Sequence, residues 1–233
     1  MTRVLYELCG IEEGLRFSPF CWRIRYALAH KGLDVETRPW RFTEKEALAF
    51  AHHDKVPVLV DNGEVITDSY EIMSYLDRCY PEAPLLGEGV AETRGRFFKH
   101  YAERALAPAI MRIIIMDLFN AIHPGDRAYF RKSREKRFGC TLEEFHSPVR
   151  GINQLNTALE PLRGQLKESP FLDGQGPAGA DYLVFGNFMW ARCASGTELV
   201  SDADPVHSWL ERMLDLHGGL GRKARRIIDV GGG

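Results

Sequence analysis

The sequence of 233 residues has few cysteines, no long apolar run and little excess charge of either sign. Its five cysteines are odd in number and scattered, which argues against a disulfide framework and predicts a reducing, cytoplasmic location. Residues 105–118 form the longest apolar stretch, but Pro108, Arg112 and Asp117 interrupt it. No run reaches the roughly 18 apolar residues of a transmembrane helix, and the N-terminus lacks a signal-peptide core, so we expect no membrane association.

The remaining composition is that of an ordinary globular protein. Hydrophobic residues make up 45% and charged residues 27%, which is enough apolar material for a substantial core. A net charge of −2 gives no electrostatic reason to expect nucleic acid as a partner. No cysteines and histidines share a metal-ligand spacing, so we also expect no metal.

The first 80 residues predict a small mixed sheet with helices on its faces. The apolar patterns and turn signals indicate a strand at 3–9, a helix at 18–31 that ends at Gly32, a strand at 33–38, a short helix to about 51 opened by a Thr43–Glu46 capping box, a hairpin at 55–66 and a helix at 70–80.

Beyond a linker at 81–90, residues 91–233 read as helix throughout. The predicted elements are a helix at 92–120 kinked by Pro108, a charged and solvated helix and loop at 123–140, a helix to 167 opened by a Thr141–Glu144 capping box, a buried helix at 180–193, a helix at 205–217 and a short basic helix at 222–228. We therefore divide the chain into domains at 1–80 and 91–233.

The start of the first helix is the strongest candidate for chemistry. Ser18 is a favoured N-cap residue, and Pro19 suits the first helical position. A hydroxyl at the positive end of a helix stabilises a negative charge, including a thiolate. An ordinary capped helix explains the same residues, so this stretch alone leaves both interpretations open.

Four motifs in one order resemble the cytosolic glutathione transferase superfamily. They are Ser18-Pro19-Phe20-Cys21, Val56-Pro57, Asp68-Ser69, and a glycine-rich loop that leads into Ala180-Asp181. The resemblance implies an α/β, thioredoxin-like N-terminal domain and an all-α C-terminal domain. Residues 128–139 and the Ser-Pro-aromatic-x-Trp-Arg opening are similar to the bacterial β-etherase-type and related fungal subgroup, whose β-etherases cleave lignin-type aryl ethers with glutathione.

The resemblance also implies a set of site residues. Glutathione would be the co-substrate, with its sulfur near Ser18, which acts as an activator of the bound thiol rather than as a nucleophile. Pro57 would be cis, with the backbone of Val56 pairing with the glutathione cysteine. The expected glutathione-binding residues are Phe20, Val56, Pro57, Asp68 for the ammonium, Ser69 for the γ-glutamyl carboxylate, and Lys55, Trp40 or Arg41 for the glycine carboxylate.

A second-substrate pocket is expected between the domains. It would be lined by the loop 10–17 and by Tyr101, Met111, Ile115 and Phe119, although each of these four is equally read as core.

Two further residues carry expectations of their own. Cys21, at the second position of a degenerate Cys-x-x-Cys spacing, is expected to be buried and inert. Asp181 matches the buried aspartate of the family, but Ala178 stands where the family has Ser or Thr, so half of the capping box is missing.

Together these features predict a cytoplasmic glutathione transferase that attacks a hydrophobic, aromatic electrophile, and the resemblance implies that it is a homodimer. Glutathione-dependent aryl ether cleavage is the variant that the subgroup implies. The alternatives are a non-catalytic protein that binds glutathione or hydrophobic ligands, and an interaction protein on the same fold.

Overall fold

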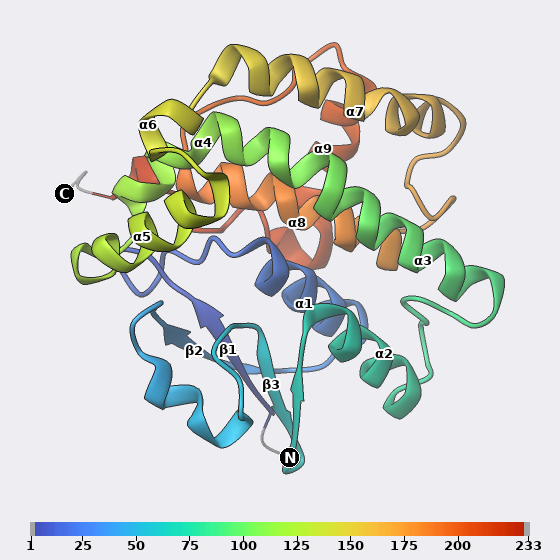
Figure 1. Ribbon diagram of the computed structural model, residues 1–233. Helices are drawn as coiled ribbons and strands as arrows, with labels where there is room; N and C mark the ends of the chain where they lie inside the picture. Colours follow the sequence, from blue (N-terminus) through green and yellow to red (C-terminus); the bar gives the residue numbers. More distant parts are fainter. Residues whose placement is uncertain (1–2, 231–233) are drawn as a thin grey trace.

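The computed structural model, which describes residues 3–230, comprises a small sheet with its helices and a larger helical half (Figure 1). The first part consists of β1 (Arg3–Leu8), α1 (Pro19–His30), β2 (Glu36–Trp40), the 3₁₀-helix η1 (Lys45–Ala51), β3 (Val58–Asp61), β4 (Glu64–Thr67) and α2 (Ser69–Cys79). The second part consists of α3 (Val90–Tyr101), the π-helical η2 (Ala102–Leu106), α4 (Ala107–Ala121), η3 (Pro124–Asp126), α5 (Arg127–Phe138), α6 (Leu142–Phe145), α7 (Pro148–Glu168), α8 (Gly179–Ala194), α9 (Pro205–Gly219) and η4 (Ile227–Asp229).

The sheet has the strand order β2-β1-β3-β4, with β1 and β2 parallel and the other pairs antiparallel. This arrangement confirms the predicted thioredoxin-like domain followed by a helical domain. The second strand begins three residues later than predicted and runs through Pro39, which pairs with Glu7. Because β2 is an edge strand, no further strand requires a hydrogen bond from the N–H that Pro39 lacks.

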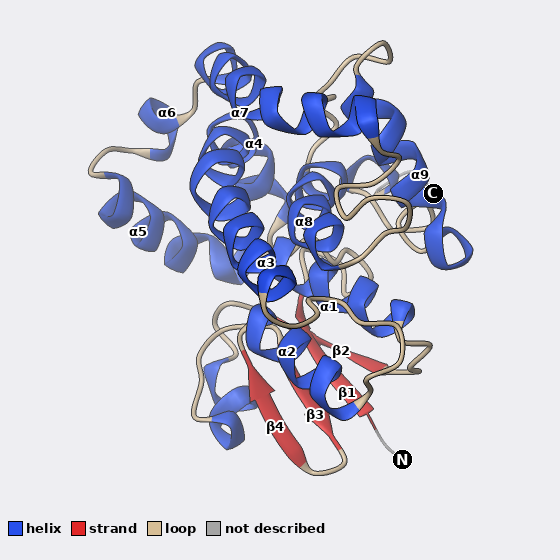
Figure 2. Cartoon of the chain, turned by 90° about the vertical axis from the view of Figure 1, so that its right-hand side faces the viewer, coloured by secondary structure: helices blue, strands red, loops and turns tan. Residues whose placement is uncertain are grey.

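Helix α1 lies between the sheet and α8, which explains why it is buried on nearly every side (Figures 1 and 2). The approach to α8 is close. A Cβ added at Gly186 of α8 would lie 2.3 Å from the carbonyl oxygen of Pro19. The first turn of α1 is therefore in direct backbone contact with the core helix of the second domain.

The segment between α2 and α3 contains no helix or strand, yet it is anchored. The Asp77 carboxylate accepts the N–H groups of Leu85 (2.8 Å) and Leu86 (2.7 Å), and both leucines are buried. The carbonyl of Leu85 in turn accepts the N–H of Gly179, the first residue of α8 (2.9 Å). The connection thus ties α2 to the start of the core helix.

Asp181 lies at the start of α8, where the capping serine or threonine is absent. Its carboxylate is fully buried and accepts the N–H of Leu172 (2.8 Å), the indole N–H of Trp209 (2.7 Å) and the N–H of Ala178 (3.2 Å). The missing half of the box comes from Asp173, whose carboxylate accepts the N–H of Ala180 at 2.7 Å. Two aspartates therefore share the work of one capping box.

Near Phe42 and the C-terminus, two predictions were wrong and one holds only in part. Thr43 does not cap η1, because its N–H (3.0 Å) and hydroxyl (2.6 Å) both donate to the buried Asp126. The charged segment 123–140 is not simply solvated, since Phe130 is fully buried and its ring lies 5.8 Å from that of Phe42. The basic helix predicted at 222–228 is reduced to η4.

The helical half confirms other predictions in part. The expected distortion at Pro108 takes the form of η2, the π-helical turn that ends two residues before the proline and joins α3 to α4. The Thr141–Glu144 capping box forms, but it opens only the four-residue α6, and the long helix starts afresh at Pro148. Among the described helices, none is long and apolar enough to cross a membrane.

Candidate functional site

The strand order brings three of the predicted motifs to one end of the sheet. The chain leaves the end of β1 through the loop that leads to Ser18. Because β3 is antiparallel to β1, with Val58 opposite Tyr6, Val56 and Pro57 precede β3 at that same end. Thr67 of β4 pairs with Val58, so Asp68 follows there as well.

Ser18 caps α1 as predicted. Its side-chain oxygen accepts the N–H of Cys21 at 3.4 Å, a long hydrogen bond, and its side chain is 4% exposed. Within residues 3–230 the Ser18 hydroxyl donates to no acceptor. A hydroxyl proton is thus available at the positive end of a helix.

The backbone of Val56 is also free to bind. The Val56–Pro57 peptide bond is cis, as the resemblance implied. Within the described chain, neither the N–H nor the C=O of Val56 takes part in a backbone hydrogen bond. A ligand with a peptide backbone could therefore pair with this residue as a short added strand.

The start of α2 provides a polar corner. Asp68 has a positive φ of 67° and caps α2, with its carboxylate accepting the N–H groups of Tyr70 (2.8 Å) and Glu71 (3.3 Å). Asp68 is exposed, whereas Ser69 is buried at the first helical position. An exposed carboxylate next to a helix N-terminus suits a ligand that carries both an ammonium and a carboxylate group.

Arg23 is a residue of the candidate site that sequence reasoning missed. Its guanidinium is fully buried and donates to the hydroxyl of Ser69 (3.4 Å), to a carboxylate oxygen of Glu103 (3.0 Å) and to the carbonyl of Leu183 (3.2 Å). Its Nη2 atom has no partner within the described residues. Arg23 belongs to the Trp-Arg pair of the first-helix motif, but its partners are 46 to 160 residues away and leave no local signal in the sequence.

Two neighbours of Ser18, the ring of Phe20 and the thiol of Cys21, have different surroundings. The Phe20 ring is 38% exposed and lies under the Arg23 guanidinium, with 4.7 Å from Cζ to the ring centroid. Cys21 is 1% exposed, and burial raises the pKa of its thiol to about 12. The structure therefore agrees with the expectation of an inert, protonated Cys21.

The three candidates for binding the glycine carboxylate have different surroundings. Trp40 is 2% exposed and its indole N–H donates to the carbonyl of Glu44 at 2.7 Å, so the structure corrects its assignment as a ligand contact. Arg41 lies 3.8 Å from the carboxylate of Glu44. Lys55 is exposed and, in the described part of the chain, forms no ion pair. Lys55 could therefore pair with a second carboxylate of a ligand without giving up an existing ion pair.

The structure does not bring the four predicted pocket residues together. Ile115 is fully buried core. Tyr101 faces α7, where its hydroxyl donates to the carbonyl of Ala158 and its ring stacks on Phe97. These two positions correct the prediction, because Ile115 is enclosed in the core and Tyr101 is turned toward α7.

Met111 and Phe119 are half-buried and remain candidates for a pocket between the domains. Phe119 lies in an aromatic group at the junction of the two domains, with its ring centroid 6.3 Å from that of Phe130. Phe42 joins the group from the N-terminal domain and lies 6.1 Å from Tyr129. The backbone of the loop 10–17 reaches the same region, because the N–H of Ile11 donates to Ala121 at 2.8 Å.

Comparison with known proteins identifies the family. The model "Glutathione S-transferase, N-terminal domain" matches residues 14–84, and "Glutathione S-transferase, C-terminal domain" matches residues 95–215. Among curated proteins, glutathione S-transferase U7 of Arabidopsis thaliana is 31% identical over 43% of this chain and 46% of its own length. Glutathione S-transferase U22 of the same plant is 24% identical over 74% and 69%. For U7 and several other curated relatives, the match spans less than half of the relative's length.

Solved structures agree over nearly the whole chain. Glutathione transferase GSTFuA3 from Phanerochaete chrysosporium is 25% identical, with a TM-score of 0.77 over 94% of this chain and 92% of that one. Glutathione S-transferase CsGST83044 of Ceriporiopsis subvermispora, solved in complex with glutathione, gives a TM-score of 0.81 at 20% identity, with coverages of 93% and 98%.

The fold is thus that of a two-domain protein with a thioredoxin-like half and a helical half. The chain belongs to the glutathione S-transferase family, as the matches to both of its domain models show.

Proposed function

We propose that this protein is a glutathione transferase in which Ser18 activates the thiol of bound glutathione for attack on a hydrophobic electrophile. The observation that carries this proposal is the free hydroxyl proton of Ser18 at the N-terminus of α1. It is flanked by the unpaired backbone of Val56 and by the polar corner at Asp68 and Ser69.

The expected activation follows from simple energetics. A thiol with a pKa of about 8.5 is only a few per cent thiolate at neutral pH. One hydrogen bond from Ser18 together with the helix N-terminus supplies about 2–3 kcal/mol, or about two pKa units, in favour of the thiolate. The thiolate then becomes the major form of bound glutathione at pH 7.

The two ends of glutathione match the remaining polar groups. The γ-glutamyl carboxylate suits Ser69 and the first N–H groups of α2, and its ammonium suits the exposed Asp68. The cysteine backbone pairs with Val56 beside Pro57. The glycine carboxylate is placed toward Lys55, and Phe20 covers the thiol end. Arg23 holds the Ser69 hydroxyl in position from behind.

The electrophile is proposed to be aromatic and to bind at the domain junction. Phe42, Phe119 and Tyr129 provide ring surfaces there, and Met111 is a further half-buried candidate. Similarity of residues 128–139 to β-etherase-type relatives favours glutathione-dependent cleavage of aryl ethers. By analogy with the family, the protein is proposed to act as a cytoplasmic homodimer.

Calorimetric titration with glutathione at pH 7 tests the proposal, using wild type, Ser18→Ala and Ser147→Ala. Ser147 is a matched control, because it also precedes a proline at the start of a helix, with no side-chain capping bond. We expect dissociation constants in the micromolar to millimolar range for all three proteins. The pKa of the bound thiol, followed by thiolate absorbance, should rise by about one to two units, equivalent to about 1–3 kcal/mol, in Ser18→Ala alone.

Turnover distinguishes the transferase from the binding protein. Activity toward 1-chloro-2,4-dinitrobenzene and toward a β-aryl ether should fall about tenfold or more in Ser18→Ala, in line with the lost stabilisation of the thiolate. Glutathione binding without turnover of any electrophile would support the non-catalytic alternative. Absence of binding at several millimolar glutathione would refute the proposed site altogether.

A further inference from the structure

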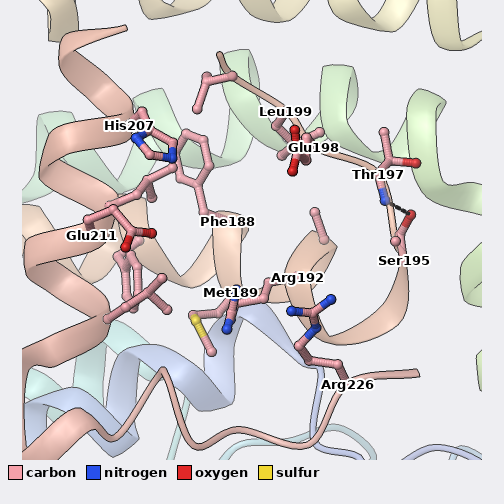
Figure 3. A pocket seen from close by; sticks show the side chains of 16 residues that line it. Phe188, Met189, Arg192, Ser195, Thr197, Glu198, Leu199, His207, Glu211 and Arg226 are labelled. Atoms are coloured by element: carbon pink, nitrogen blue, oxygen red, sulfur yellow. Dashed lines mark hydrogen bonds between the residues drawn. The ribbon is translucent and has the colours of Figure 1, made fainter. Parts of the chain in front are cut away.

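A cavity lies in the helical domain, away from the proposed glutathione site. It has a volume of about 230 Å³ and is lined by the C-terminal half of α8, the segment 195–200, α9 and Arg226 (Figure 3). None of the residues proposed to bind glutathione lines it. We refer to it as the α8–α9 pocket.

The α8–α9 pocket has an apolar body. Phe188 and Met189 project from α8 and Leu199 from the connecting segment (Figure 3). Leu210 of α9 also lines the pocket. Phe188 also packs edge-on against the buried Trp209, with 5.9 Å between ring centroids. The apolar wall is therefore held by the core of the domain and does not depend on a mobile surface side chain.

Two arginines without partners face this apolar body. Arg192 and Arg226 are both half-buried, and in residues 3–230 the Nε atom of each is buried without a hydrogen-bond partner. Neither arginine forms an ion pair with a described residue. Burial, followed by the nearby charge of Arg226, lowers the pKa of the Arg192 guanidinium. The two cations thus repel each other, and within the described chain no carboxylate lies at ion-pair distance from either.

The acidic groups of the pocket do not neutralise this pair. Glu211 is engaged by Arg222 at 2.9 Å. Asp202 does not line the pocket, and its carboxylate lies 3.4 Å from Nε2 of His207. Glu198 is exposed on the segment 195–200 at the opposite side of the pocket (Figure 3). The arginine end of the pocket therefore keeps a positive charge next to an apolar surface.

We propose that the α8–α9 pocket binds a small amphipathic anion, with its carboxylate or sulfonate on Arg192 and Arg226 and its apolar body against Phe188, Met189, Leu199 and Leu210. Guanidinium groups favour planar oxyanions because they present paired N–H donors. An apolar cavity of about 150 Å³ holds benzene, so the observed volume accommodates one aromatic ring with a short acidic side chain.

The test is calorimetric titration of the full chain with 3-phenylpropanoate and with its neutral analogue 3-phenylpropanamide. S-hexylglutathione is present at saturating concentration, to cover the proposed glutathione site and the domain junction. We expect the carboxylate to bind about tenfold more tightly than the amide. Arg192→Gln and Arg226→Gln should each weaken carboxylate binding by about the same factor and leave amide binding unchanged.

Arg225→Gln is the matched control, because it removes the same charge from the same segment while Arg225 points to Glu12 (3.1 Å) and not into the pocket. It should bind 3-phenylpropanoate as wild type does. Equal affinity for the carboxylate and the amide would overturn the proposal, as would an effect of Arg225→Gln equal to that of the pocket variants. Because the arginine variants report on the pocket alone, the result is independent of the proposed transferase activity.

Discussion

Replacing Asp181 tests how much the buried hydrogen bonds at the start of α8 contribute to the free energy of unfolding. In addition to Leu172, Trp209 and Ala178, the carboxylate accepts the N–H of Asp173 at 3.2 Å, so four donors converge on one buried group. Burial raises the pKa of Asp181 to about 6, so the carboxylate is ionised at neutral pH. Its removal leaves four donors without an acceptor in a buried site.

The magnitude follows from the number of donors. Each buried donor left unsatisfied costs about 1–3 kcal/mol. Asp181→Ala should therefore lower the free energy of unfolding by at least about 4 kcal/mol, a large share of the about 5–15 kcal/mol typical of a domain. Asp181→Asn keeps one oxygen for two donors but turns an NH₂ group toward the other two, so we expect about 2–5 kcal/mol.

Urea unfolding at pH 7, followed by tryptophan fluorescence, measures these differences. Asp202→Asn is the control, since the Asp202 side chain is 94% exposed, and it should change stability by less than about 0.5 kcal/mol. A loss within about 1 kcal/mol of the control for Asp181→Asn would show that water or rearranged groups satisfy the four donors, and the reasoning would be wrong.

Two further predictions concern packing and pH. Gly186→Ala should destabilise the protein by about 1–3 kcal/mol through the close approach of α8 to α1, whereas Gly164→Ala, with open space around its Cβ, should stabilise it by about 0.5–1 kcal/mol in the same urea assay. Burial lowers the pKa of both His30 and His217, which share the hydroxyl of Tyr182 (2.8 and 3.3 Å). As the pH falls, these histidines therefore become protonated at a higher pH in the unfolded state than in the folded state. The free energy of unfolding should decrease below about pH 6.5, and the decrease should be shallower in a variant with both histidines replaced by Gln.

Much of the N-terminal domain could be predicted because its signals are local. Ser18 with Pro19, and Asn62 with its positive φ of 52° in the hairpin turn, each fix the backbone within a few residues. Gly32, with φ of 64°, ends α1 in the same way. Such positions depend little on the rest of the chain, so a single sequence reveals them.

The predictions are wrong where a residue distant in sequence accepts the hydrogen bonds that the local pattern assigns to near neighbours. Thr43 has the spacing of a capping box with Glu46, but Asp126, 83 residues away, captures its hydroxyl and its N–H. A buried carboxylate is a stronger acceptor than the exposed turn that the local pattern predicts. The Thr141 box did form, because no distant acceptor competes for Thr141 within the described residues.

The proposed glutathione site shows the same division. Its hydroxyl, its cis proline and its helix start were readable, since each belongs to a short motif. The two pocket residues that were wrongly predicted are Tyr101 at the end of α3 and Ile115 in α4. Which way each side chain faces depends on the packing of α7 and on the π-helical turn η2 that joins the two helices. A shift of one residue in helical phase turns a side chain by about 100°, so apolar spacing alone does not decide which neighbour it faces.

Arg23 shows why the site requires both domains. Its guanidinium is fully buried, and the carboxylate that compensates its charge belongs to Glu103 in η2 of the helical domain. The same guanidinium holds the hydroxyl of Ser69 and reaches the backbone of Leu183 in α8. Without the helical domain, Arg23 would be an uncompensated charge beside Ser69, at a cost larger than a surface ion pair returns. The thioredoxin-like half therefore carries the polar groups of the site, and the helical half makes their arrangement stable.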